Sequence, residues 1–134
     1  MAANTVPVFT NVPIVGAGLT STTSNSALSG TSLANSTTIV TGATNGTKVA
    51  EINCIPTGTI LVGTVNIFLE DASNNFWLYD QIQVSAQTLT TGNPQQRWNK
   101  QYPKLIVPTG WSLVVTQTGQ TTNALVVIAL GSTF

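Results

Sequence analysis

Three of the four cationic residues in the chain, Arg97, Lys100 and Lys104, lie close together, with Trp98 and Tyr102 between them. Cationic and aromatic side chains in one segment can bind nucleic acid, a sugar or a protein partner. Nucleic-acid binding usually comes with a basic face, but this chain has as many acidic as basic residues and no net charge. Three cations neutralise about three phosphates, too few for tight non-specific binding at physiological salt. We therefore expect no nucleic-acid partner.

The segment that carries these residues, 95–104, is expected to connect a strand over 76–90 with one over 104–107. Connections carry binding residues more often than strands do, and Trp and Arg are enriched among the residues that dominate protein interfaces. Three interpretations stay open: a solvated loop with Trp98 folded over the edge of the core, a loop that docks on a protein, and a loop that binds a sugar or nucleic acid. The candidate interface residues are Arg97, Trp98, Lys100, Tyr102, Trp77 and Tyr79.

The residue types needed for common catalytic sites are mostly missing. The chain has no histidine, which excludes Ser-His-Asp and Cys-His nucleophile systems, and it has one cysteine, too few for a protein zinc site. Of the four acidic residues, Glu70 and Asp71 are adjacent and would point to opposite faces of a strand. Only Asp80 could approach one of them to form the carboxylate pair of a glycosidase. We therefore expect neither an enzyme nor a bound cofactor.

Asp71, Asn74, Asn75 and Asp80 carry oxygen ligands of the kind that calcium prefers. Their spacing does not match an EF-hand, and the same residue types are common in hairpin loops, so we expect a turn and no metal site. The single cysteine, Cys54, lies in an alternating stretch and is expected to be a small buried core residue.

Charge is scarce and unevenly placed. Charged residues make up 6% of the chain, against roughly 25% in a typical soluble domain. All eight charges lie between Lys48 and Lys104, which leaves residues 1–47 and 105–134 uncharged. Such a surface has little electrostatic self-repulsion, so we expect its flanks to become covered in an assembly. No secretory signal and no run long enough for a membrane helix are evident, so a protein made in the cytosol is expected.

Short β-branched and alternating segments separated by turn signals predict an all-β fold, and no helical period is present. We expect an antiparallel β-sandwich, or jelly-roll-like fold, over 37–134, with residues 1–36 as an extended N-terminal arm or loop, of which 4–19 are extended. The expected strands are 37–41, 48–54, 59–70, 76–84, 111–118 and 123–130.

Two of these strands have a predicted orientation that bears on the surface. The strand over 59–70 is apolar on both faces, so it is central or buries its second face in a partner. In the strand over 76–84, alternation places Phe76, Leu78, Ile82 and Val84 inward and the two candidate aromatics outward. Residues 71–75 are expected to form a hairpin loop before it.

A pattern over the last two thirds of the chain matches a known group. It consists of a strand, a hairpin rich in Asp and Asn, an aromatic-bearing strand, a turn with Pro and Gly, another strand, and a last hydrophobic strand ending in Gly-x-x-Phe. Here the parts after the first strand are Asp71–Asn75, Trp77–Tyr79, Pro108–Trp111, Leu113–Val115 and Leu125–Phe134. Through this pattern the chain resembles the capsid cement, or head decoration, proteins of tailed bacteriophages.

The resemblance implies a β protein, commonly a homotrimer, that sits at threefold or quasi-threefold positions outside the expanded head and clamps the major capsid protein. We accordingly expect a virion structural protein, made in the host cytoplasm, whose partners are the major capsid protein and further copies of itself. A partner that binds only the assembled shell stabilises it by mass action. The alternatives are a tail-fibre, baseplate or head-fibre β-module that binds a host glycan, and a carbohydrate-binding module that uses Trp77, Tyr79 and Trp98.

Overall fold

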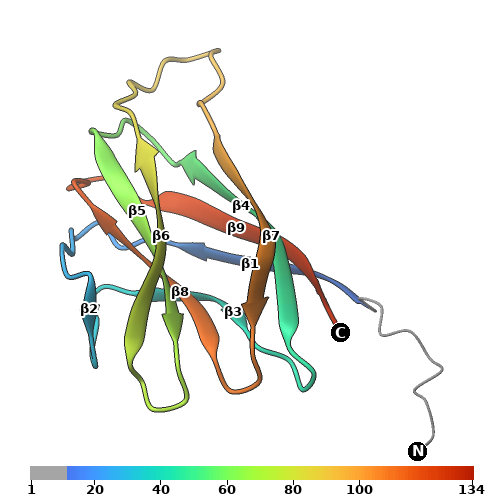
Figure 1. Cartoon of the computed structure of the whole chain (residues 1–134). Coiled ribbons are helices and arrows are strands. Elements are labelled where there is room, and N and C mark those ends of the chain that lie inside the picture. The colour runs from blue at the N-terminus through green and yellow to red at the C-terminus, as the bar shows by residue number, and fades with distance from the viewer. Residues whose placement is uncertain (1–11) are drawn as a thin grey trace, which may run out of the picture.

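The computed structural model describes residues 12–134, and these form two antiparallel sheets packed face to face (Figure 1). A four-stranded sheet has the order β1-β9-β4-β7, and a five-stranded sheet has the order β2-β6-β5-β8-β3. The predicted all-β antiparallel sandwich is therefore confirmed. The strands are β1 (Val12–Leu19), β2 (Ser29–Gly30), β3 (Thr37–Thr41), β4 (Thr47–Pro56), β5 (Gly63–Glu70), β6 (Phe76–Val84), β7 (Trp98–Val107), β8 (Ser112–Thr118) and β9 (Leu125–Thr133).

The strands pair in a nested order along the chain. With the short β2 set aside, β1 pairs with β9, β3 with β8, β4 with β7, and β5 with β6. Each of the strands β1, β3, β4 and β5 thus pairs with a strand from the second half of the chain. The innermost pair, β5 with β6, is a hairpin closed by residues 71–75. The expected hairpin loop and the strands 37–41 and 76–84 are confirmed with their predicted bounds.

Aliphatic side chains from the inner faces of both sheets fill the core. Cys54 is fully buried among them, as its alternating context predicts, and burial raises the pKa of its thiol to about 12. Its neighbours in the core include Ile52, Val65, Ile67, Leu105, Val107, Leu113, Val115, Leu125 and Val127. Within residues 12–134 no helix is long and apolar enough to cross a membrane.

The middle of the five-stranded sheet, at β5 and β8, is buried on both faces. Phe68 of β5 and Val114 of β8 point away from the main core and pack with Phe76 and with Leu33, which is 7% exposed. Leu33 belongs to the segment 20–36, so this stretch of the chain folds back over the sheet. The second face of the central strand is therefore covered by the chain itself.

Residues 12–36 thus belong to the sandwich, although the sequence suggested an arm over 1–36. β1 pairs along its whole length with β9, and the following segment is tied to β8 by hydrogen bonds. The amide N–H of Asn25 donates to the carbonyl of Gln117 at 2.8 Å, and the Thr118 hydroxyl donates to the carbonyl of Asn25 at 2.9 Å. The expected arm residues 1–11 lie outside the described residues.

Two expected strand patterns differ from the structure. The strand predicted over 59–70 begins at Gly63. Residues 59–62 form a loop that is held by the Gln120 side chain at Leu61 and by the Gln87 backbone at Ile60. In β6, Phe76 and Leu78 lie on the outer face and not on the core face. The reason is a β-bulge: Ile67 pairs with Asp80 and Phe68 with Leu78, which leaves the residue between them unpaired and reverses the alternation.

A substitution in the covering segment tests its role. We expect Leu33→Ala to lower the free energy of unfolding by about 2–4 kcal/mol, because it opens a cavity over Phe68. Leu28→Ala is the control: Leu28 is 45% exposed in the same segment, so its loss should change stability by less than about 0.5 kcal/mol. Urea denaturation measures both. Equal stability of the two variants would mean that the segment does not cover the sheet.

Candidate functional site

The cationic and aromatic segment lies on a strand and not in a connection. Arg97 directly precedes β7, and Trp98, Lys100 and Tyr102 are part of it. β7 is an edge strand of the four-stranded sheet and contains Pro103, at a position where its register with β4 is interrupted. Proline is tolerated at such edges and bulges, but it argues against a strand when only the sequence is read. The prediction of a loop is therefore wrong for 98–104, whereas 95–97 lie in the connection before β7.

An ion pair and a hydrogen bond join the edges of the two sheets at this strand. The Oδ2 atom of Asp80 on β6 lies 2.6 Å from the Nζ atom of Lys100. The hydroxyl of Tyr102 donates to the same Asp80 oxygen at 2.9 Å. The ring of Tyr102 is buried and packs against that of Tyr79, with ring centroids 5.8 Å apart. Tyr79, Asp80, Lys100 and Tyr102 therefore form one cluster, which we call the edge clamp.

The two ionisable groups that meet in the edge clamp have shifted pKa values. Partial desolvation acts to raise the pKa of Asp80, but hydrogen bonds from Lys100, the Gln81 backbone and Tyr102 outweigh it, so the pKa is lowered. Burial, and then the hydrogen bond to Asp80, raise the pKa of Tyr102. The carboxylate and the neutral phenol are thus the forms that stabilise the fold.

The hairpin loop 71–75 is organised by the carboxylate of Asp71. It accepts hydrogen bonds from the backbone N–H of Ser73 at 2.8 Å, from that of Asn75 at 3.0 Å, and from the indole N–H of Trp77 at 3.1 Å. These bonds, led by that from the Asn75 backbone, lower the pKa of Asp71 to about 2. The predicted turn is confirmed, and residues 12–134 contain no cluster of acidic, histidine or cysteine residues that could hold a metal ion.

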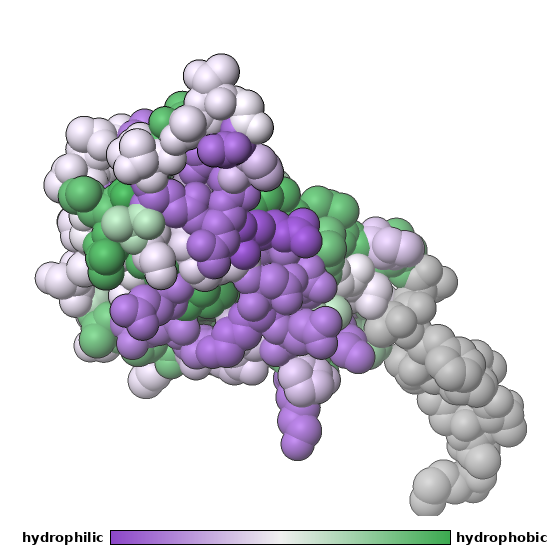
Figure 2. Space-filling model, turned by 90° about the horizontal axis from the view of Figure 1, so that it is seen from above, coloured by the Kyte–Doolittle hydropathy of each residue, from purple (hydrophilic) through white to green (hydrophobic). Residues whose placement is uncertain are grey.

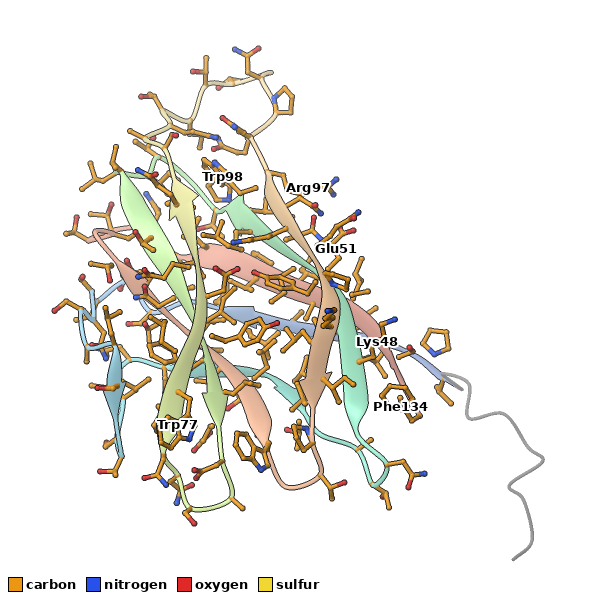
Figure 3. All side chains as sticks on the ribbon, viewed as in Figure 1. Lys48, Glu51, Trp77, Arg97, Trp98 and Phe134 are labelled. Atoms are coloured by element: carbon orange, nitrogen blue, oxygen red, sulfur yellow. The ribbon has the colours of Figure 1, made fainter. Side chains whose placement is uncertain are left out.

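The six candidate interface residues do not form one patch. Tyr79, Lys100 and Tyr102 meet in the edge clamp, while Trp98 and Trp77 lie at opposite ends of the sandwich (Figure 3). Trp98 packs partly buried against the core, as the solvated-loop interpretation expected of its side chain. Trp77 is 57% exposed and Tyr79 is 41% exposed, and we call these two aromatic residues of β6 the β6 strip.

A second exposed apolar group lies where the chain connects β4 to β5 and β6 to β7. Leu61, Val62 and Leu89 are each more than half exposed, and we call this surface the loop end. The two connections are joined by a pair of backbone hydrogen bonds between Ile60 and Gln87, at 2.9 and 3.0 Å. The loop end is therefore one surface built from two loops, and the second loop leads to Arg97.

The loop end is held rigid by a buried amide. Gln120, only 1% exposed, accepts from the N–H of Leu61 at 3.0 Å and donates to its carbonyl at 2.6 Å. The backbone N–H of Gln120 in turn donates to the side chain of Gln117 at 2.8 Å. Both backbone groups of Leu61 are thus hydrogen-bonded, so the backbone that carries its exposed side chain is held in place.

The outer face of the four-stranded sheet is the third apolar surface, and sequence reasoning did not find it. We call it the sheet face. Strand register places Val15, Leu130 and Glu51 side by side across β1, β9 and β4. Val15 is 71% exposed. The residues of the sheet face are Pro13, Val15, Ala17, Leu19, Val126, Ile128, Leu130, Ser132, Lys48, Glu51, Asn53, Ile55, Asn99, Gln101 and Ile106.

The sheet face is divided into an apolar and a polar half. β1 and β9 supply mainly aliphatic side chains, whereas β4 and β7 supply a hydrogen-bonded row in which Asn99 donates to Asn53 and Asn53 donates to Glu51. Hydrophobic and hydrophilic residues are also gathered in separate areas of the view in Figure 2. The signal in the sequence was the run over 125–130, which is apolar at successive positions and so must be covered on two faces or exposed on one.

Searches for matching protein families, curated proteins and solved structures found no match to this chain.

The edge clamp predicts a pH-dependent stability. Asp80→Asn should lower the free energy of unfolding by about 1–2 kcal/mol at pH 7, because a charge-assisted bond to Lys100 is lost. The pKa of Asp80 is lower in the folded state, so its contribution is present above its unfolded pKa of about 3.9 and is lost as the pH falls through the folded value. Urea denaturation at several pH values between 7 and 2 measures this.

In that series the difference between wild type and Asp80→Asn should shrink toward acid pH. Tyr102→Phe is the companion variant, because it keeps the ring packing on Tyr79 and removes only the hydroxyl that donates to Asp80. A difference between Asp80→Asn and wild type that stays constant from pH 7 to pH 2 would contradict the assignment.

Proposed function

We propose that this chain is a virion structural protein, a decoration protein that binds the outer surface of a phage head and stabilises the lattice of major capsid protein. The observation that carries the proposal is that large apolar side chains are exposed on three separate surfaces: the loop end, the sheet face and the β6 strip. A soluble monomer rarely exposes contiguous apolar surface on several sides, whereas a subunit inside an assembly has contacts on several sides.

The scarcity of charge supports the same proposal. The chain carries four basic and four acidic residues, and one pair of opposite charges is used within the fold by the edge clamp. Bringing many such subunits together on a shell costs little electrostatic repulsion. Inside the fold, buried amides and hydroxyls form hydrogen bonds with one another in place of ion pairs, as Asn66 does with Thr116 and Gln81.

We further infer that the sandwich is a jelly roll. The support is the nested pairing, in which the four strand pairs β1–β9, β3–β8, β4–β7 and β5–β6 alternate between the two sheets. Jelly rolls occur in viral capsid proteins and also in lectins, so the topology favours a virion or glycan-binding role without deciding between them.

The loop end is the surface that we assign to the head. Its exposed side chains, Leu61, Val62 and Leu89, are apolar. Its backbone is held by hydrogen bonds to Gln120 and by those between Ile60 and Gln87. A surface that is already ordered loses little conformational entropy when it docks, so more of the contact energy appears as affinity. Binding only to the assembled shell then stabilises that shell by mass action.

A glycan-binding fibre module is the second candidate, and the β6 strip is the observation that favours it. Trp77 is exposed and its indole N–H is fixed by Asp71, so its ring is held in place, with Tyr79 two residues along the strand. Sugar rings stack on such aromatic faces. This candidate places binding on the β6 strip, whereas the head-binding proposal places it on the loop end.

Cosedimentation with undecorated phage heads tests the proposal. We expect wild-type protein to pellet with the heads and to raise their thermal transition. Leu61→Ser combined with Val62→Ser should weaken binding at least about tenfold, because two exposed anchors are lost without a change to the core. Leu28→Ser, a change of the same kind outside the loop end, should bind as wild type does.

Two results would count against the proposal. If the chain does not pellet with any heads, the decoration role fails. If Trp77→Ala abolishes binding to a glycan array while the loop-end variant binds as wild type, the fibre-module alternative is favoured.

A further inference from the structure

The turn between β3 and β4 contains a reactive pair of residues. Asn45-Gly46 is the one Asn-Gly dipeptide in the sequence. It lies at the opposite end of β4 from the connection to β5, and so away from the loop end (Figure 1). Asn45 is exposed, and its side chain forms no hydrogen bond to any part of residues 12–134. By contrast, the side-chain amide of Asn123 donates to the carbonyl of Thr59 at 2.6 Å.

An asparagine followed by glycine can lose its side-chain amide without an enzyme. The backbone nitrogen of Gly46 attacks the Cγ atom of Asn45, and glycine has no Cβ to hinder the approach. The new N–Cγ bond closes a five-membered succinimide, the Cγ–Nδ2 bond breaks, and ammonia leaves with the proton that the Gly46 nitrogen gives up. Water then opens the ring. Opening at Cγ gives aspartate, and opening at the main-chain carbonyl gives isoaspartate, whose backbone runs through Cγ.

The folded turn holds the attacking nitrogen away from its target. The N–H of Gly46 donates to the carbonyl of Ala43 at 2.8 Å, which closes a β-turn. The hydroxyl of Thr109 lies 2.9 Å from that same carbonyl oxygen and 2.6 Å from the carbonyl oxygen of Thr44, and it donates to them. The Gly46 nitrogen must leave its bond to Ala43 before it can turn toward Asn45. Opening of the turn therefore precedes the reaction.

We infer that Asn45 is a site of spontaneous deamidation, and that the hydroxyl of Thr109 restrains the reaction by holding the turn closed. The inference does not depend on the proposed head-binding role, because the turn belongs to none of the three exposed apolar surfaces.

Deamidation changes both the charge and the backbone at this end of the sandwich. A carboxylate at position 45 is the first charged side chain within residues 1–47, and it leaves the chain with one more acidic than basic residue. Isoaspartate also adds one carbon to the main chain directly before β4, where Thr47 pairs with Val107 on one side and Thr133 on the other. We expect the isoaspartyl form to unfold at a lower urea concentration than fresh protein.

Ageing of the purified chain at mildly alkaline pH tests the inference. The reaction should be faster as the pH rises, because the Gly46 nitrogen must give up its proton. Each event adds one dalton and one negative charge, so anion-exchange chromatography separates the product. Residues 1–47 contain no lysine or arginine, so trypsin releases Asn45 in the peptide that ends at Lys48, and tandem mass spectrometry locates the site. Asn35, which is also exposed but is followed by serine, is the internal control and should keep its amide.

Removal of one hydroxyl tests the role of the turn. Thr109→Val should raise the deamidation rate about tenfold, the factor that one lost hydrogen bond is worth. Thr57→Val is the matched control, because the exposed Thr57 hydroxyl donates to the carbonyl of Ala124 at 2.7 Å near the other end of β4. It should react as wild type does, and so should Thr109→Ser, which keeps the hydroxyl. Circular dichroism checks that each variant is folded.

A synthetic peptide of residues 41–50 gives a comparison that needs no variant. The turn is not held closed in the peptide, so its asparagine should react faster than Asn45 of the folded chain. Four results would overturn the inference: no conversion of Asn45 in the folded chain, earlier conversion of Asn35, equal rates for Thr109→Val and Thr57→Val, and equal rates for the peptide and the folded chain.

Discussion

The burial of β5 and β8 on both faces is the constraint from which the rest of the structure follows. Val65 and Ile67 point into the main core, while Phe68 and Val114 point away from it and are equally buried. Apolar side chains on a second face must be covered, and the segment 20–36 provides the cover. Covering the sheet removes polar groups from water, so each must find a partner, and Asn66 bonds to the hydroxyls of Thr116 and Thr118 and to the amide of Gln81.

The two sheets meet along both sides of the sandwich, through β1 and β3 on one side and through β6 and β7 on the other. On one side, glycines of β1 let the strand approach β3: a side chain at Gly18 would place its Cβ 2.7 Å from Thr37 Cγ2, and one at Gly16 would overlap the carbonyl of Ile39. On the other side, the edge clamp joins β6 to β7 through Asp80. With the sides closed and the middle of one sheet covered, the apolar surfaces that residues 12–134 leave exposed are the sheet face, the loop end and the β6 strip.

This distribution connects the physical chemistry of the chain to its proposed role. A domain with few charges relies on amide hydrogen bonds for rigidity, as at Leu61, and on aliphatic contact for association, as at Val15. The amide hydrogen bonds give loops that are ordered before binding, and the aliphatic surfaces associate without strong electrostatic repulsion. Both properties suit a subunit that acts by being added to a larger structure, where many weak contacts are made together.

The sequence by itself determined the all-β class, most strand positions, the Asp71 turn and the burial of Cys54, because these depend on local alternation and turn chemistry. It did not determine β7, because Pro103 and the polar residues before it resemble a loop until an edge position accommodates them. It misplaced Phe76, since a single unpaired residue in a bulge reverses every side chain beyond it. Only the tertiary structure decided that segment 20–36 covers the middle of one sheet, that Asp80 meets Lys100 and Tyr102, and that β1 and β9 combine into an apolar face that nothing within residues 12–134 covers. These contacts join residues far apart in the chain, and no local pattern states which distant segment will cover which face.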